Sequence, residues 1–201
     1  MKQSIAEILK KDKIVCVDGF LSTSMCTTIL EELEYSFWKR STVIDPRIHE
    51  SHLSNTRVSK SADQVLFTDT LLEVVEKIEN DIKSLFEVDL NRLEHWQATK
   101  YAKHGKFDYH YDSGAWREHY AGERKKTYLL YLNTPKKGGA THFKNLDIRV
   151  KPKQGRLLVW DNLLPDGNCN YDMLHAGLPI VNGKKTTLVT WERQKEIRQK
   201  L

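Results

Sequence analysis

The second half of the chain constrains the fold most, because it consists of short strand-like runs separated by turn signals. From about Leu93 onward, segments rich in β-branched and aromatic residues alternate with Gly-Gly, Asn-Gly and Pro-containing turns. The candidate strands are 93–101, 107–112, 127–132, 147–150, 156–160, 173–175 and 185–191. Roughly seven short strands of this kind indicate a β-sandwich or a barrel-like double sheet.

The first 92 residues show a different pattern, which predicts mainly helices that support the strands of the second half. We predict a short helix over 1–12, a strand over 14–17, and amphipathic helices over 25–38 and 71–85, the first capped by Ser22 or Ser24. The polar segment 41–63 shows no periodicity and is predicted to form a lid, since long connections are usually functional or mobile. The second helix carries its apolar stripe on Leu72, Val75, Ile78, Ile82 and Leu85.

Helices first and strands afterwards predict an α+β fold, with helices packed on one face of a jelly roll. We expect one domain over 1–201, with 93–193 as its β core. The mean hydropathy of −0.58 fits a globular protein, and no apolar run is long enough to cross a bilayer. The N-terminus lacks the apolar core of a secretory signal, so we expect a cytoplasmic protein without membrane partners.

Cysteine content and charge set further limits. Cys16, Cys26 and Cys169 cannot all pair and show no C-x-x-C spacing, so a disulfide scaffold or zinc site is not supported. The net charge of +5 favours acidic partners, nucleic acid included, only mildly. The basic residues are scattered, which is typical of solvated faces and turns.

One strand carries a candidate metal site. Side chains two apart in a strand share a face, so His110 and Asp112 would emerge together while Tyr109 and Tyr111 face the other way. With His175 as a third ligand they could occupy three adjacent positions of an octahedral metal and leave the opposite face open. That arrangement is typical of non-haem Fe(II) oxygenases. The His-x-Asp pair alone also occurs by chance.

Lys185 matters to this site only if it points into the barrel. A three-residue turn before it would place the odd-numbered residues inside, His175 and Lys185 among them. A two-residue turn would instead bury Lys184, Thr186 and Thr190, so we favour the first register. A buried lysine requires an anion, and a dicarboxylate that also chelates iron would supply one. The alternative is a surface lysine beside a turn.

These residues lie within a pattern that resembles the prolyl 4-hydroxylase-like Fe(II)- and 2-oxoglutarate-dependent dioxygenases over nearly the whole chain. The matching segments, in order, are 18–22, 57–59, 97–101, 110–112, 127–133, 138–143, 150–155, 175–177, Pro179, 183–185 and Trp191. The resemblance implies a double-stranded β-helix (jelly-roll or cupin-like) core with supporting N-terminal helices. It also implies Fe(II) as cofactor, 2-oxoglutarate and O₂ as cosubstrates, and ascorbate as a reductant.

The resemblance assigns roles to individual residues. The catalytic metal ligands map to His110, Asp112 and His175, and the cosubstrate lysine maps to Lys185. Further residues of the 2-oxoglutarate pocket fall on Tyr101, Tyr131 and Trp191. On the substrate side we expect Arg57, Phe107 and Arg124. Two positions depart from the family pattern, because Phe107 replaces a frequent tyrosine and Ala140 replaces a usual acidic residue.

The resulting functional prediction is 4-hydroxylation of proline in a protein or peptide. One alternative is hydroxylation of a free amino acid or another small molecule on the same scaffold. Nucleic-acid demethylation is less expected, because Lys185 stands where such repair enzymes carry an arginine-containing pattern after the second histidine. A non-catalytic binding module would need a lost ligand, and none is missing. The oligomeric state is not predicted.

Overall fold

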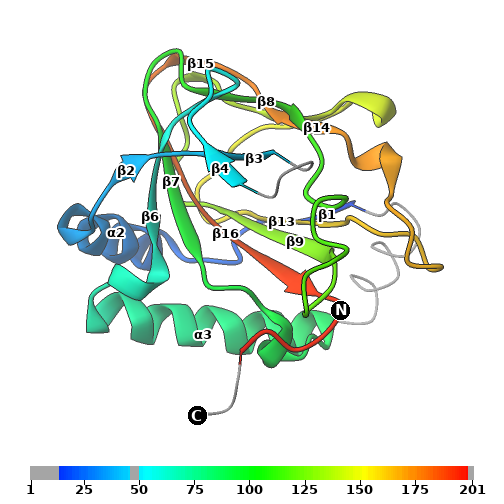
Figure 1. The fold of residues 1–201 in the computed structure, drawn as a ribbon. Helices are drawn as coiled ribbons and strands as arrows, with labels where there is room; N and C mark the ends of the chain where they lie inside the picture. The colour runs from blue at the N-terminus through cyan, green and yellow to red at the C-terminus, as the bar shows by residue number, and fades with distance from the viewer. Residues whose placement is uncertain (1–13, 46–49, 199–201) are drawn as a thin grey trace.

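Two antiparallel sheets face each other in the computed structural model, which describes residues 14–45 and 50–198 (Figure 1). The larger sheet has the order β1 (Ile14–Val17), β13 (Leu157–Asp161), β9 (Arg124–Tyr131), β16 (Lys185–Arg193), β7 (Gln97–Tyr101), β6 (Lys60–Asp63), β2 (Lys39–Arg40). The smaller sheet has the order β12 (Ile148–Val150), β11 (Thr141–Phe143), β14 (His175–Gly177), β8 (Lys106–His110), β5 (Arg57–Val58). The predicted α+β class with a jelly-roll-like double sheet is confirmed. The helix expected over 1–12 lies outside the described residues.

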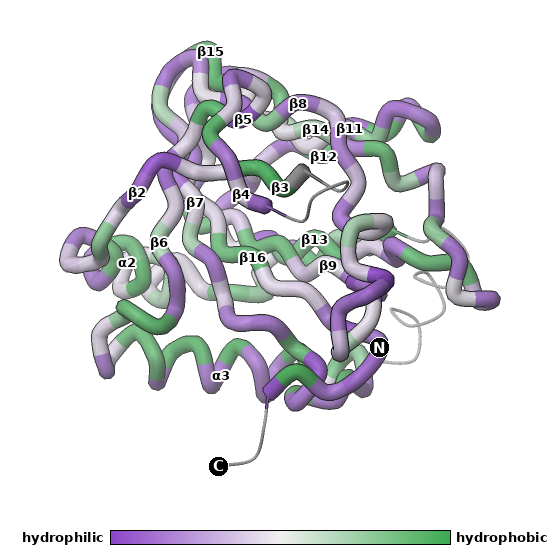
Figure 2. Tube along the Cα trace, in the orientation of Figure 1, coloured by the Kyte–Doolittle hydropathy of each residue, from purple (hydrophilic) through white to green (hydrophobic). Residues whose placement is uncertain are grey.

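Helix α3 (Asp69–Phe86) covers the outer face of the larger sheet, below it in Figure 1. Thr68 caps the helix by accepting a hydrogen bond from the backbone of Leu71. Along α3, apolar residues alternate with polar ones in Figure 2. The buried apolar positions are Leu71, Val75, Ile78 and Ile82, which pack with Ala62, Ala98, Leu130 and Leu188 of the sheet. The stripe therefore begins at Leu71, and the assignment of Leu72 to it was wrong because that side chain is 37% exposed.

Helix α2 (Thr23–Glu32) is shorter than predicted. Ser22 caps it, as one of the two predicted alternatives. A 3-10 turn follows over Leu33–Tyr35, and the chain then leaves the helix toward β2. The indole of Trp38 donates to the carbonyl of Leu33, which holds the chain in this bend. Phe37 is consequently exposed rather than part of a helical stripe.

The segment 41–63, predicted as a polar connection, contains strands. The hairpin of β3 (Val43–Asp45) and β4 (Glu50–His52) lies there, β5 joins the smaller sheet, and β6 joins the larger one. Sequence periodicity missed these strands because Ala62 is the only buried apolar side chain among the described residues of this segment, and its buried serines satisfy one another. Ser41 hydrogen-bonds to Ser61 at 2.6 Å and accepts from Ser59 at 2.8 Å. That the segment acts as a lid stays a prediction.

The turn at Asn182-Gly183 does not form a β-hairpin, so both registers considered for it were wrong. Strand β15 (Ile180–Asn182) pairs with β10 (Lys137–Gly138), whereas β16 is hydrogen-bonded on both sides by β7 and β9. The odd-numbered residues of β16 nevertheless line the cavity between the sheets. The even-numbered residues are also buried, among them Thr186 and Thr190, because the helices cover their face.

Most predicted strands agree with the structure to within a few residues. The expected strand 173–175 is a correction, because 171–173 is a 3-10 turn and β14 starts at His175. Strands β10, β11 and β15 were missed, since each has only two or three residues. Cys16, Cys26 and Cys169 are free thiols. Among the described residues, no helix has the length and apolar character needed to cross a bilayer.

Candidate active site

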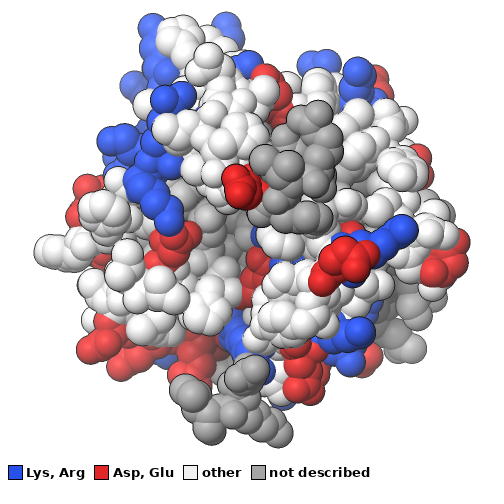
Figure 3. Space-filling model, in the orientation of Figure 1, with Lys and Arg blue, Asp and Glu red and all other residues white. Residues whose placement is uncertain are grey.

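A cavity of about 990 Å³ lies between the two sheets and is lined by residues from both. Figure 3 shows a hollow at the centre of the face that is viewed there. The larger sheet supplies one wall through β16, β7 and β9, and the smaller sheet supplies the other through β8 and β14. The candidate metal ligands, Lys185 and both candidate substrate arginines line this one cavity.

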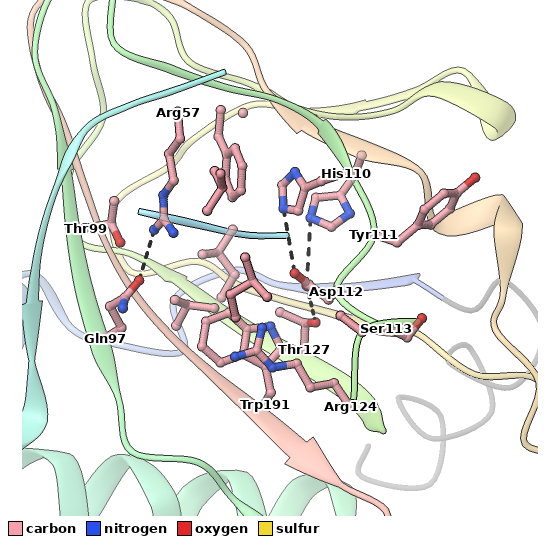
Figure 4. A pocket seen from close by; sticks show the side chains of 18 of the residues that line it. Arg57, Gln97, Thr99, His110, Tyr111, Asp112, Ser113, Arg124, Thr127 and Trp191 are labelled. Atoms are coloured by element: carbon pink, nitrogen blue, oxygen red, sulfur yellow. Dashed lines mark hydrogen bonds and ion pairs between the residues drawn. The ribbon is translucent and has the colours of Figure 1, made fainter. Parts of the chain in front are cut away.

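His110, Asp112 and His175 meet in the cavity, and Figure 4 labels the first two. Strand β8 ends at His110, so Asp112 lies two residues beyond the strand whose alternation was expected to place it. Strands β8 and β14 pair so that His110 lies directly opposite His175. Nε2 of His110 is 3.7 Å from Oδ1 of Asp112, and Nε2 of His175 is 3.8 Å from Oδ2. One possible ligand atom from each of the three residues lies within 4.8 Å of the others. Tyr109 and Tyr111 face outward and are 42% and 36% exposed.

Both imidazoles are oriented by backbone carbonyls. Nδ1 of His110 donates to the carbonyl of Asp108 at 2.8 Å, and Nδ1 of His175 donates to that of Met173 at 2.9 Å. A carbonyl oxygen only accepts, so each Nδ1 carries a hydrogen and each Nε2 is the ring nitrogen that faces Asp112. Burial, followed by the neighbouring His175, lowers the pKa of His110 and favours its neutral form.

Asp112 is held as an ionised acceptor. Burial opposes its ionisation, but His175, His110 and Arg124, together with a hydrogen bond from Thr127, keep the pKa of this carboxyl below its ordinary value. Oγ1 of Thr127 donates to Oδ2 at 2.6 Å and accepts from the amide of Asn162 at 2.8 Å. Two imidazoles oriented by backbone carbonyls and one fixed carboxylate, converging in the cavity, fit the donor set of a non-haem Fe(II) centre.

Aromatic rings pack around the cluster. The ring of Phe107 stacks on His110 with centroids 3.6 Å apart, and the guanidinium of Arg57 lies 4.7 Å from the centroid of Phe107. The rings of Trp160 and His175 pack edge-on, with their centroids 4.9 Å apart. Phe107 lines the cavity as expected, but its ring faces contact Arg57 and His110. The ring therefore supports a ligand imidazole.

Lys185 is buried, so its interpretation as a surface residue is wrong. Its Nζ donates to the carbonyl of Gly139 at 2.9 Å and lies 4.5 Å from the ring centroid of Tyr101, its partner across the β7–β16 ladder. Burial lowers the pKa of Lys185 to about 8. No carboxylate within the described part of the chain forms an ion pair with it. This end of the cavity therefore suits the carboxylate of a ligand.

The structure also places the other two residues that were expected beside the cosubstrate. Tyr131 is fully buried in a core cluster and does not line the cavity, and its hydroxyl bonds instead to Thr141, which does. Burial raises the pKa of Tyr131. Trp191 lines the cavity six residues along β16 from Lys185, and the guanidinium of Arg124 covers its ring at 3.6 Å. The structure thus brings together only Tyr101 and Lys185 of this set.

The two candidate substrate arginines line opposite parts of the cavity wall. Arg57 donates to the carbonyl of Thr42 at 3.0 Å and to the side chain of Gln97 at 2.9 Å (Figure 4). Arg124 forms a two-point ion pair with Glu94 at 2.7 and 2.8 Å. Both cations are therefore fixed in place before any substrate binds.

Sequence reasoning missed several residues that shape the site. Thr127 and Asn162, which fix Asp112, carry no signal of their own because threonine is common in strands and asparagine in turns. Only the pairing of β9 with β13, which sets Thr127 opposite Trp160, brings them there. Glu94 could have been suspected, since a carboxylate next to a buried strand needs a cation.

Comparison with known proteins was made against this geometry. A model of the 2OG-Fe(II) oxygenase superfamily matches residues 96–193. The chain is 32% identical over 197 residues to prolyl 4-hydroxylase subunit alpha-1 of Gallus gallus, and 28% identical over 195 residues to subunit alpha-2 of Caenorhabditis elegans. These alignments cover 94% of this chain but 37% and 36% of the relatives. The chain thus spans about a third of the length of the curated relatives that it matches.

Solved structures share the fold. A viral collagen prolyl hydroxylase from Paramecium Bursaria Chlorella virus-1, solved as a 2OG complex, superposes with a TM-score of 0.67 at 24% identity, covering 90% of this chain and 96% of the other. A prolyl hydroxylase from Trichoplax adhaerens, in complex with a hypoxia inducible factor peptide, gives a TM-score of 0.68 at 15% identity, with 96% and 89% covered. The likeness confirms the predicted double-stranded β-helix core.

Proposed function

The chain belongs to the 2OG-Fe(II) oxygenase superfamily as a prolyl hydroxylase-like member, and from this premise we propose that it hydroxylates proline residues of a polypeptide. One observation carries the proposal. A buried cluster of two histidines and one carboxylate shares a cavity with a buried lysine that has no carboxylate partner among the described residues. A metal ion would complete the cluster of histidines and carboxylate, and a dicarboxylate would supply the anionic partner that the lysine lacks.

His110, Asp112 and His175 would hold Fe(II) as the catalytic metal ligands. Bound iron would supply, with O₂ and 2-oxoglutarate, the oxidising chemistry that decarboxylates the cosubstrate and inserts oxygen into a C–H bond. The carbonyls of Asp108 and Met173 keep both Nε2 atoms available, and Thr127 keeps the carboxylate of Asp112 in place. The protein thus prepares the donor set before the metal arrives.

Lys185 would bind the far carboxylate of 2-oxoglutarate, with Tyr101 beside it. The ammonium of Lys185 is already aimed into the cavity and held by the carbonyl of Gly139. The hydroxyl of Thr141, which also lines the cavity, is oriented by Tyr131 and could donate to the same carboxylate. Trp191 would then form part of the cavity wall, and Tyr131 would support Thr141. Both would act at a distance from this carboxylate.

The substrate would enter beside Arg57, Phe107 and Arg124, which line the rest of the cavity. The curated relatives are named prolyl 4-hydroxylases, and the Trichoplax structure holds a peptide, so we take a proline-containing polypeptide as the substrate class. The volume of about 990 Å³ leaves room for a substrate side chain next to the cosubstrate. Ascorbate as a reductant and a cytoplasmic location stay predictions from the sequence.

The test uses the purified protein with Fe(II), 2-oxoglutarate, O₂ and proline-rich peptides. We expect 2-oxoglutarate to be converted to succinate while the peptide gains one oxygen atom on proline, as mass spectrometry detects. Succinate formation without a gain on any peptide would contradict the substrate class and favour a small-molecule hydroxylase. Absence of both products, with iron bound, would contradict the proposed reaction.

A further inference from the structure

A row of cations crosses the outer face of the larger sheet, away from the candidate metal cluster. Arg40 of β2 lies directly opposite Lys60 of β6, and Lys60 lies directly opposite Lys100 of β7. Cross-strand partners project from the same face, at a strand spacing of about 4.8 Å. Burial lowers the pKa of Lys100, the nearby Glu34 raises it, and Lys60 and the exposed Lys184 lower it further. We call Arg40, Lys60, Lys100 and Lys184 the cationic row.

The cationic row is only partly balanced by the described part of the protein, because the carboxylate of Glu34 lies near Lys100. None of its four members forms an ion pair with a described residue. Arg40 contacts the neutral side chain of Asn55 at 3.4 Å, and Lys100 lies over the ring of Trp38 at 4.0 Å. Like charges directly opposite each other destabilise a sheet. Among the described residues, Glu34 and the ring of Trp38 compensate the charge of Lys100, whereas Arg40, Lys60 and Lys184 have no anionic partner in an ion pair.

The row is accessible to a partner. Ala62 and Ala98, two residues away on the same face, are fully buried in the core that the helices cover. The side chains of Lys60 and Lys184 are exposed instead, so the row lies beyond the helical layer. Figure 3 shows Lys and Arg side chains gathered at the upper left, on the same face of the molecule as the central hollow.

The same strands also form a wall of the cavity. Asp63 of β6 and Thr99 and Tyr101 of β7 line the cavity, from the sheet face opposite to that of Lys60 and Lys100. A polypeptide with one residue in the cavity could therefore continue around this wall to the row. A partner for a row of four cations must be anionic.

We propose that the cationic row is an exosite for an acidic segment of the polypeptide substrate, near the residue that enters the cavity. The inference rests on the proposed function, because it takes the occupant of the cavity to be a polypeptide. A single extended chain then serves both sites, and its glutamate or aspartate side chains pair with the row. The exosite would select substrates by the sequence that flanks the modified residue.

The test compares two fluorescently labelled peptides with the same proline-containing centre, one flanked by six glutamates and the other by six glutamines. Binding is measured by fluorescence anisotropy with metal-free protein at low salt. We expect the acidic peptide to bind more tightly and its advantage to fall as salt is added. The double variant Lys60→Glu/Lys100→Glu should weaken binding of the acidic peptide about tenfold or more, with much less effect on the glutamine peptide.

A matched control separates the row from net charge. Lys77 and Lys83 are exposed on α3, and Lys77→Glu/Lys83→Glu changes the total charge by the same amount. This control should bind the acidic peptide as the wild type does. Equal loss in both double variants, or no preference for the acidic peptide, would overturn the exosite. So would tighter binding of a single-stranded oligonucleotide of equal charge at the row.

The outcome is separable from the proposed function, since binding is measured without turnover. Acidic-peptide binding at the row without any proline hydroxylation would contradict the proposed function alone. Hydroxylation of both peptides with equal KM values would contradict the exosite alone. If both inferences hold, KM for the acidic peptide is lower, and Lys60→Glu/Lys100→Glu raises it toward that of the glutamine peptide.

Discussion

The hydroxyl of Thr127 donates a hydrogen bond of 2.6 Å to the carboxylate of Asp112 and thereby joins the larger sheet to the candidate metal cluster. Thr127→Val keeps the shape of the side chain but removes this donor. Partners of this kind are worth about 10–100-fold in metal affinity. We expect Thr127→Val to weaken Fe(II) binding by that range in an anaerobic titration.

Thr127→Ser is the matched control, because it retains the hydroxyl and loses only a methyl group. Its Fe(II) affinity should stay within a few-fold of the wild type. Equal affinities for the valine and serine variants would show that the hydrogen bond to Asp112 does not support the metal.

Cosubstrate binding should depend on pH through Lys185. Burial lowers its pKa to about 8, so the ammonium is present below that pH and is lost as the pH rises through it. A carboxylate ligand requires the charged form, and the dissociation constant of 2-oxoglutarate should therefore rise about tenfold per pH unit above pH 8. Calorimetric titration of 2-oxoglutarate from pH 7 to 10 measures this slope.

Lys185→Arg provides the comparison, since a guanidinium stays protonated throughout this range. Its affinity for 2-oxoglutarate should be nearly constant above pH 8, whatever its absolute value. A wild-type affinity that is equally flat would argue against Lys185 as the carboxylate-binding group.

Gly155 should be far less tolerant of a side chain than Gly19, although both have a positive φ. At Gly19 an added Cβ meets nothing within 4 Å, so Gly19→Ala should cost only the backbone strain of about 1 kcal/mol. At Gly155 the same atom would overlap the carbonyl oxygen of Leu21. We expect Gly155→Ala to lower the free energy of unfolding by about 3 kcal/mol or more, as urea denaturation measures. Similar losses for both variants would contradict this packing.

Two adjacent leucines test the corrected face of α3. Leu71 is fully buried and Leu72 is 37% exposed. Leu71→Ala should lower the free energy of unfolding by about 2–5 kcal/mol, because it leaves a cavity under the sheet. Leu72→Ala should cost less than about 1 kcal/mol. A larger loss of unfolding free energy in Leu72→Ala than in Leu71→Ala would show that α3 buries the face with Leu72, as its sequence spacing first indicated.

The candidate metal cluster was predictable because its geometry is local. Two residues of spacing keep His110 and Asp112 close although β8 ends at His110, and the family pattern supplies the third ligand. The sequence left two alternatives for Lys185, a buried or a surface lysine. Burial was favoured on the basis of a hairpin turn before β16, and that turn does not form. The turn before β16 joins strands of different sheets, and the lysine faces inward because the register of β16 with β7 and β9 turns its odd-numbered residues toward the cavity.

What could not be predicted depends on pairing between distant segments. The strands within 41–63 escape sequence patterns because the buried groups described there, Ala62 apart, are serines that hydrogen-bond to one another. Tyr131 was expected in the cosubstrate pocket, and the structure places its hydroxyl against Thr141, which lines the cavity, while Tyr131 itself does not. The position of Thr127 beside Asp112 likewise follows from sheet register, which a single strand does not reveal.

Anaerobic absorption spectroscopy tests the joint iron and 2-oxoglutarate site most directly, since a charge-transfer band arises only when 2-oxoglutarate chelates bound Fe(II). The wild type should develop this band with one iron per chain and only when both ligands are present. His175→Ala should lose it, whereas His119→Ala, which alters a histidine outside the cluster, should keep it. An undiminished band in His175→Ala, or no band in the wild type, would contradict the assignment of His110, Asp112 and His175 as the iron site.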